Sequence, residues 1–206
     1  MRARVLLALV LVLTTVRAAE AGARRSRPTK TGQTLCWDAA GAAATCAGTG
    51  QDGDLRRGES RAFQDNGNGT IRDKRTALTW EKLSDDGSIH DKDNVYSWVQ
   101  AFAKIDDLNT AAFAGATDWR LPNLFELQTL VDVGTAYPAI VAACNTGCSP
   151  GCTVLTCSCS SLNYSWTSST SADDERYKWS VYFGLGSTGA NLAQSPFTVR
   201  AVRGGS

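Results

Sequence analysis

The distribution of cysteine constrains the fold of this chain more than any other feature of its sequence. Five of the seven cysteines lie within sixteen residues, and the other two lie ten residues apart, at Cys36, Cys46, Cys144, Cys148, Cys152, Cys157 and Cys159. An odd number of thiols cannot pair completely within one chain, so at least one stays free. Cysteines at short spacing form disulfides in oxidising compartments and bind metals elsewhere, so the destination of the chain decides their chemistry.

The N-terminus resembles a secretory signal peptide. Arg2 and Arg4 precede an apolar run over residues 5–13, and small residues follow it. The run is too short for a bilayer-spanning helix, which needs about 20 residues. We expect cleavage after Ala21, so residues 1–21 are assigned to the signal peptide, with an uncleaved anchor as the alternative. The mature protein is then secreted, periplasmic or on the cell surface.

The charge balance excludes a nucleic-acid partner. The formal net charge is +1, and removal of residues 1–21, with three arginines and one glutamate, changes it to −1. A nucleic-acid-binding protein needs a strongly basic surface to displace counterions. The 43% hydrophobic and 20% charged fractions are typical of a globular domain, and no further apolar segment is long enough to span a membrane. The only histidine, His90, leaves little scope for a histidine-rich metal site or a catalytic triad.

The first part of the mature chain is predicted to be a leader and a small cross-linked segment. Residues 22–33 are basic and contain proline, which indicates a flexible leader. Cys36 and Cys46 flank a turn of small residues, and we expect them to pair and to close a hairpin-like segment over residues 34–60. A loop of this size adds about 2–3 kcal/mol of stability by restricting the unfolded chain.

The cysteine-rich insertion at residues 144–159 is predicted to hold two further bridges and one free thiol, which is either buried or bonded to another chain. Cys157 and Cys159 would point to the same face of a strand, so each should bond to a different partner. The alternative is a thiolate metal site, but the spacing lacks the C-x2-C pairs that identify zinc sites.

Periodicity predicts an α+β domain over residues 61–206. Alternating apolar residues and turn signals indicate five strands, at residues 70–72, 77–81, 164–169, 178–183 and 197–203. Glycine-rich turns at residues 184–189 should join the last two strands as a hairpin.

Two helices are expected between these groups of strands. Asn94 should cap the first, which runs to Asn109 and buries one apolar face made of Val95, Trp98, Val99, Phe102, Ile105 and Leu108. The second follows Pro122, where Asn123 and Glu126 have the spacing of a capping box and the buried stripe comprises Leu124, Leu127, Leu130 and Val131.

Two polar segments are candidate ligand sites. Asp65, Asn66 and Asn68 have the oxygen density of a calcium loop, but the EF-hand spacing and its closing glutamate are missing, so a plain turn is favoured and no cofactor is required. His90 lies in the acidic loop of residues 83–93 beside several aspartates, where it is either a metal ligand, a general base or, as we favour, a solvated side chain.

Five motifs resemble the C-terminal domain of Legionella collagen-like proteins, an exported bacterial family of unknown function. They are D-N-G-N-G-T (65–70), A-L-T-W (77–80), D-W-R-L-P-N-x-x-E-L-x-x-L-V-D (118–132), W-T-S-S-T (166–170) and V-R-A-V-R-G-G (199–205). The resemblance implies a C-type-lectin-like fold, with two helices flanking a small, twisted, mostly antiparallel sheet, and with long loops that disulfides staple here. Its structural signature falls on Trp80, Trp119, Arg120, Leu121, Pro122, Glu126 and Trp166. The insertion at residues 144–159 departs from the simplest family pattern.

The resemblance implies a non-catalytic binding or adhesion domain for a glycan or a surface protein. One alternative is a structural envelope component held by its leader or its spare thiol. A less favoured alternative is an enzyme, because residues 120–126 also resemble a segment of formylglycine-generating enzymes. Those enzymes depend on a cysteine pair near the C-terminal end, and no cysteine follows Cys159 here. The sequence sets no oligomeric state.

Overall fold

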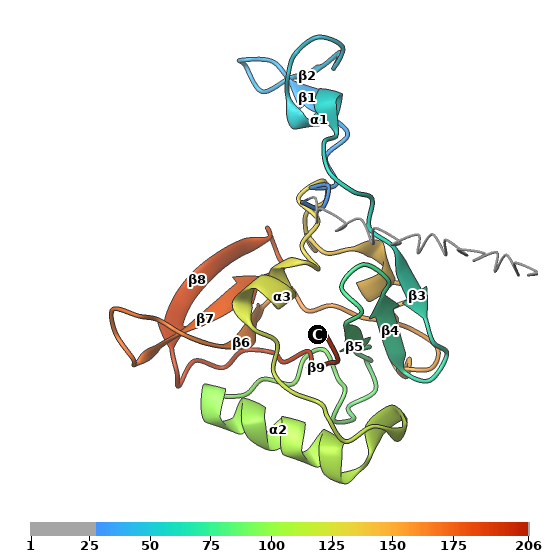
Figure 1. Cartoon of the computed structure of the whole chain (residues 1–206), viewed down its shortest axis with the longest axis vertical. Coiled ribbons are helices and arrows are strands. Elements are labelled where there is room, and N and C mark those ends of the chain that lie inside the picture. The colour runs from blue at the N-terminus through green and yellow to red at the C-terminus, as the bar shows by residue number, and fades with distance from the viewer. Residues whose placement is uncertain (1–27, 206) are drawn as a thin grey trace, which may run out of the picture.

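The computed structural model describes residues 28–205, so the predicted signal peptide and the first part of the leader lie outside the described residues. This part of the chain is an α+β structure of short helices, small antiparallel sheets and disulfides (Figure 1). In chain order its elements are β1 (Cys36–Trp37), β2 (Ala43–Ala44), α1 (Asp52–Leu55), β3 (Phe63–Asp65), β4 (Thr70–Asp73), β5 (Thr79–Glu81), α2 (Trp98–Thr110), η1 (Phe113–Gly115), α3 (Leu124–Gln128), η2 (Ala142–Cys144), β6 (Tyr164–Thr170), β7 (Tyr177–Tyr182), β8 (Ser187–Leu192) and β9 (Val202–Arg203).

Two sheets form the body of the molecule. One has the order β3-β4-β5-β9 and the other the order β6-β7-β8, and every pairing in them is antiparallel. The last strand, β9, lies beside β5, with Val202 opposite Trp80. Helix α3 lies against β6 and β7, and α2 runs along one side of the molecule (Figure 1). The beginning and the end of the domain therefore meet in one sheet.

The N-terminal segment stands at one end of the molecule (Figure 1). Cys36 and Cys46 form the expected disulfide across β1 and β2. A flexible leader would make no regular contacts with the rest of the chain. The described part of the leader does make such contacts. Thr29 pairs with Glu59, and the Thr31 carbonyl accepts a hydrogen bond from Val133 N at 3.0 Å. Its backbone is therefore hydrogen-bonded to the body of the protein.

The core consists of two clusters around fully buried tryptophans and a smaller cluster of Leu83, Cys157 and Cys159. Trp80 packs with the apolar residues of β4, α3 and β7, and Trp166 packs with α2 and the segment that leads into β9. Each indole buries a large apolar area, so these two side chains anchor the sheets to the helices. The Trp166 Nε1–H donates to the Tyr96 carbonyl at 2.8 Å, which satisfies its polar atom in the core.

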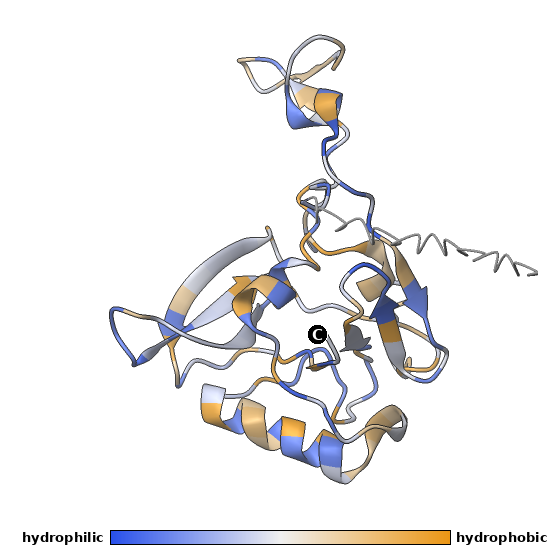
Figure 2. Ribbon diagram, viewed as in Figure 1, coloured by the Kyte–Doolittle hydropathy of each residue, from blue (hydrophilic) through white to orange (hydrophobic). Residues whose placement is uncertain are grey.

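Helix α2 begins later than predicted, and only part of its predicted apolar face is buried. Ser97, not Asn94, caps it, in a capping box with Gln100. The residues before it are held instead by the C-terminal segment, since Tyr96 N donates to the Phe197 carbonyl at 2.8 Å. Val99 is 71% and Phe102 38% exposed, and the buried face comprises Ala101, Lys104, Ile105 and Leu108. Figure 2 shows hydrophobic and hydrophilic residues on the same helix.

The predicted C-terminal hairpin is wrong. β7 pairs with β8, and β8 includes residues 187–189 of the segment for which the sequence predicts a turn. Residues 197–203 instead return between the sheets, where Thr198 bridges to Ser165 and Val202 pairs with Trp80. The capping box of α3 at Asn123 and Glu126 is present as expected, although the helix ends at Gln128.

A buried charge network connects these elements. Glu81 at the end of β5 is fully buried, and its carboxylate lies 3.0 Å from the ammonium of Lys104 on α2 and accepts a hydrogen bond from Ala201 N at 2.9 Å. The guanidinium of Arg200 is also buried and donates to the Glu81 carbonyl at 2.8 Å. A buried charge is tolerated only when it is paired and hydrogen-bonded, so this network specifies how α2 and the C-terminal segment meet β5.

Replacing Glu81 by alanine should destabilise the domain strongly. The substitution leaves the Lys104 ammonium buried without a carboxylate, and loss of one partner of a buried pair costs about 3–5 kcal/mol. Denaturant unfolding followed by tryptophan fluorescence measures the loss. Glu59→Ala, which removes the half-exposed partner of Arg75, is the matched control and should cost less than about 1 kcal/mol. Equal losses in the two variants would contradict a special role for the buried pair.

The network should also make stability depend on acid pH. Burial by itself opposes ionisation of Glu81, but Lys104, His90 and the Ala201 N–H outweigh it and lower the pKa of this carboxyl to about 2 from the ordinary 4.5. The stability that the carboxylate contributes is therefore complete above about pH 4.5 and is lost as the pH falls to about 2. Denaturant unfolding at a series of pH values should show this decline, and Glu81→Gln should make it shallower.

Candidate functional site

A polar groove opens where the acidic loop meets the chain that leaves the cysteine-rich loop. Its volume is about 460 Å³, and its lining comprises Lys92, Asp93, Ser160, Ser161, Leu162 and Asn163. Small-molecule sites in proteins have volumes of roughly 300–1,000 Å³. The sequence pointed to only one of these six residues, Asp93, and only as an aspartate of the acidic loop around His90. Two loops far apart along the chain form the groove, and neither carries a recognisable motif.

A second cavity of about 290 Å³ lies between the N-terminal segment and the body. Most of its charged groups already have partners, since Arg61 pairs with Asp132 at 3.0 Å and the Thr31 hydroxyl donates to Asp52. The cavity is therefore part of the interface between two segments of one chain, which already bond to each other across it. The polar groove is the better candidate for a ligand.

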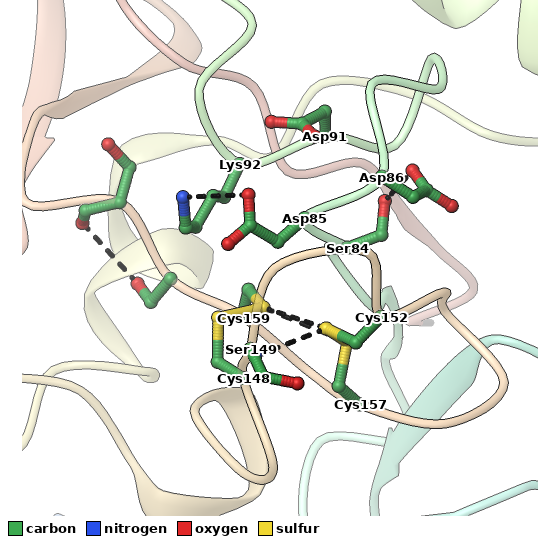
Figure 3. The surroundings of a disulfide bond; sticks show 12 residues. Ser84, Asp85, Asp86, Asp91, Lys92, Cys148, Ser149, Cys152, Cys157 and Cys159 are labelled. Atoms are coloured by element: carbon green, nitrogen blue, oxygen red, sulfur yellow. Dashed lines mark hydrogen bonds and ion pairs between the residues drawn. A yellow bond between two sulfur atoms is a disulfide. The ribbon is translucent and has the colours of Figure 1, made fainter.

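Two disulfides shape the loop that leads into the groove. Cys148 bonds to Cys159 and Cys152 bonds to Cys157 (Figure 3). Cys157 and Cys159 thus have different partners, as their spacing predicted. All four sulfur atoms are paired in these two disulfides, as the disulfide interpretation predicts.

Backbone hydrogen bonds fix this loop to the acidic loop. Cys159 N donates to the Leu83 carbonyl at 2.7 Å. Asp85 forms two backbone bonds with the cysteine-rich loop: Asp85 N donates to the Cys152 carbonyl at 3.0 Å, and Gly151 N donates to the Asp85 carbonyl at 2.6 Å. On the far side, Arg200 donates to the Cys159 carbonyl at 2.6 Å. The chain that enters the groove at Ser160 is therefore held, just before that residue, by a disulfide, by backbone bonds and by Arg200 of the buried charge network.

The acidic loop carries its own counterion. The Lys92 ammonium lies 3.2 Å from Asp85 and 2.6 Å from Asp93 (the Asp85 pair is drawn in Figure 3). Burial opposes the charge of Lys92, but its bonds to Asp93 and Asp85 prevail and raise its pKa. Asp85, Asp91 and Asp93 are close enough to hold a cation together, yet Lys92 already pairs with two of them.

The sequence suggested that the side chain of His90 points into solvent, and this prediction is wrong. Its Nδ1 lies 2.7 Å from the Glu81 carboxylate, its ring packs against Phe113 at 4.3 Å, and its side chain is only 14% exposed. The aspartates beside His90 in the sequence suggested an exposed loop. The carboxylate that holds the ring belongs to Glu81 of β5, so the sequence around His90 gives no sign of it. His90 is a member of the buried network and does not line the groove.

The oxygen atoms of the calcium candidates take part in the turn between β3 and β4. Asp65 pairs with Lys82 at 2.7 Å and also accepts from Gly67 N, and Asn68 accepts from the Thr70 hydroxyl. Asn66 donates to the same hydroxyl. Protein groups thus hydrogen-bond much of the turn, which agrees with the plain-turn interpretation, and calcium binding there stays a prediction.

The residues of the structural signature maintain the fold and lie outside the groove. Trp119 and Leu121 are buried with Trp166, whereas Trp80 lies in the other cluster. Arg120 forms two bonds to Glu126, at 2.7 and 2.8 Å, and so connects β9 to the start of α3. It does not pair with Asp118, whose partner is Arg203 at 2.6 Å. The Pro122 carbonyl accepts a hydrogen bond from Ser168 N at 2.8 Å.

The unpaired cysteine is Cys144, and it is completely buried at the end of η2. Burial raises the pKa of its thiol, which keeps the sulfur protonated and unreactive. A buried sulfur cannot reach a second chain, so the folded protein offers no thiol for an intermolecular bridge among the described residues.

Thiol titration tests this arrangement directly. The native mature protein should give no reaction with an aromatic disulfide reagent, whereas the same protein in denaturant without reductant should give one thiol per chain. Cys144→Ser should abolish the signal in denaturant. A thiol that reacts at once in the native protein would contradict the burial of Cys144.

The comparison with known proteins bears on the whole domain. No curated protein matches the chain significantly. Among the described residues, none of the helices is long and apolar enough to cross a membrane. The model of the Lcl C-terminal domain family matches residues 69–203, which include both sheets except for β3, both longer helices and the cysteine-rich loop. A match over this share of the sequence agrees with the motifs that first suggested the resemblance, and the chain belongs to the Lcl C-terminal domain family.

Proposed function

We propose that this protein is an exported, non-catalytic binding module that recognises a carbohydrate in the polar groove, on a C-type-lectin-like scaffold. The observation that carries the proposal is that the chain enters the groove at Ser160 from a loop held by two disulfides and by backbone bonds to the acidic loop. A site that is already ordered loses less conformational entropy when it binds a ligand.

The chemistry of the lining suits a sugar. Hydroxyl, amide, carboxylate and ammonium groups offer both donors and acceptors, and Leu162, which is 49% exposed, offers an apolar surface. Sugars combine ring hydroxyls with apolar ring faces, so a groove of this composition can satisfy both. Asp93 and Lys92 neutralise each other, which favours a neutral sugar over a strongly charged one.

The hydroxyl groups of the groove support binding and not catalysis. The Ser161 hydroxyl accepts a hydrogen bond from Asn163 N at 3.2 Å, and the Ser160 hydroxyl donates to the Ser161 carbonyl. In the described chain, neither serine is hydrogen-bonded to a base that would activate it as a nucleophile.

Other features support the scaffold and the location. The two helices, the antiparallel strands, the long stapled loop and the return of the last strand to the first sheet are all compatible with a C-type-lectin-like domain. Three disulfides are typical of proteins outside the reducing cytosol. A structural envelope role through an intermolecular disulfide is disfavoured, because Cys144 is buried.

A glycan array probed with the mature protein tests the proposal. We expect retention on one class of sugar, and Leu162→Ala should weaken it by roughly tenfold, because the apolar contact with the sugar is lost. Leu155→Ala is the matched control, since Leu155 is 64% exposed on the same loop outside the groove and its loss should leave binding unchanged. Absence of retention on every glycan, or equal effects of the two variants, would refute the proposal.

A further inference from the structure

The two disulfides of the cysteine-rich loop lie in contact with each other. The Cys159 sulfur is 3.6 Å from that of Cys152 and 3.7 Å from that of Cys157, which belong to the other bridge (Figure 3). The sulfur atoms of Cys148, Cys152 and Cys159 all lie within 4.8 Å of one another. In a tetrahedral zinc site with Zn–S bonds of about 2.3 Å, neighbouring sulfurs are about 3.8 Å apart. The Cys159 sulfur therefore lies at nearly the spacing of a tetrathiolate site from both sulfurs of the other bridge, and its own partner, Cys148, is bonded to it.

The surroundings of these sulfurs stabilise negative charge. The Ser149 N–H points at the Cys152 sulfur at 3.5 Å, and backbone N–H groups of this kind stabilise metal-bound thiolates. Arg200 is buried and donates to the carbonyls of Glu81, Cys144 and Cys159, so these bonds leave its charge unneutralised. A positive charge beside Cys159 offsets part of the charge that four thiolates would carry.

We propose that Cys148, Cys152, Cys157 and Cys159 form a second, reduced state of this loop, in which they bind one zinc-type divalent cation as a tetrathiolate site. Each disulfide takes two electrons and two protons from a dithiol reductant, which is itself oxidised to a disulfide. The cation then displaces the four thiol protons, and the sulfurs of each former bridge move apart by side-chain rotation. The disulfides and the metal site are two oxidation states of one cluster.

This second state would preserve the groove. Either two disulfides or one metal ion cross-links residues 148–159, and the backbone bonds to Leu83 and Asp85 need neither. The loop would thus stay ordered in a reducing environment, such as the cytoplasm before export. The sulfur positions and the groups around them carry this inference, which does not depend on the ligand of the groove.

Cobalt binding by the mature chain tests the site. The protein is reduced with a phosphine, freed of reductant without air, and titrated with Co²⁺, which reports its ligands by absorption. We expect one ion per chain, with the near-ultraviolet band of cobalt–thiolate bonds and the strong visible bands of a tetrahedral ion, and no such spectrum from the oxidised chain. Zn²⁺ should displace the cobalt.

Matched cysteine variants locate the ion. Cys148→Ser and Cys157→Ser should each weaken cobalt binding by roughly tenfold or more and alter the spectrum. Cys144→Ser and the double variant Cys36→Ser, Cys46→Ser should leave it unchanged. The proposal is overturned if the reduced wild-type chain gives no thiolate band, if Cys144→Ser abolishes that band, or if circular dichroism shows that reduction unfolds the domain and neither ion restores it.

Discussion

The buried carboxylate of Glu81 is the interaction on which the rest of the architecture depends. It lies at the end of β5, where Lys104 on α2, His90 on the acidic loop and the backbone of Ala201 all bond to it. An ionised group in a low-dielectric interior is tolerated only when its partners arrive in the correct geometry. The network therefore selects one arrangement of a strand, a helix, a loop and the C-terminal segment, and hydrophobic burial alone would be less selective.

Arg200 extends this selection from the core to the surface. It bonds the carbonyls of Glu81 and Cys159, so one side chain connects the central strand to the cysteine-rich loop. The disulfides of that loop, and its backbone bonds to Leu83 and Asp85, then leave the groove wall few conformations to adopt. The buried charges of Glu81 and Arg200 therefore help to position the surface site that we propose for a sugar, although neither residue lines the groove.

The errors of sequence interpretation arise from the same network. Helical periodicity placed Val99 and Phe102 in the core, yet they are exposed, because the inward direction of α2 is set by Lys104 and its bond to Glu81. His90 was assigned to solvent because its neighbours in the sequence are acidic and polar. The C-terminal segment was assigned to a hairpin, although it returns between the sheets to pair with β5. In each case a partner distant in sequence outweighed a local preference.

Local patterns in the sequence were enough to identify the α+β class, the family, the bridge between Cys36 and Cys46, the different partners of Cys157 and Cys159, and the capping box at Asn123. These features depend on alternation, turn chemistry or short spacing, which act over a few residues. Contacts between distant segments were needed to show that Cys144 is the free thiol, that His90 is turned inward and that Lys92 and residues 160–163 line one groove. Those outcomes depend on contacts between segments that are distant in the sequence. Buried charges, whose partners also lie far away in the sequence, help to determine which segments meet.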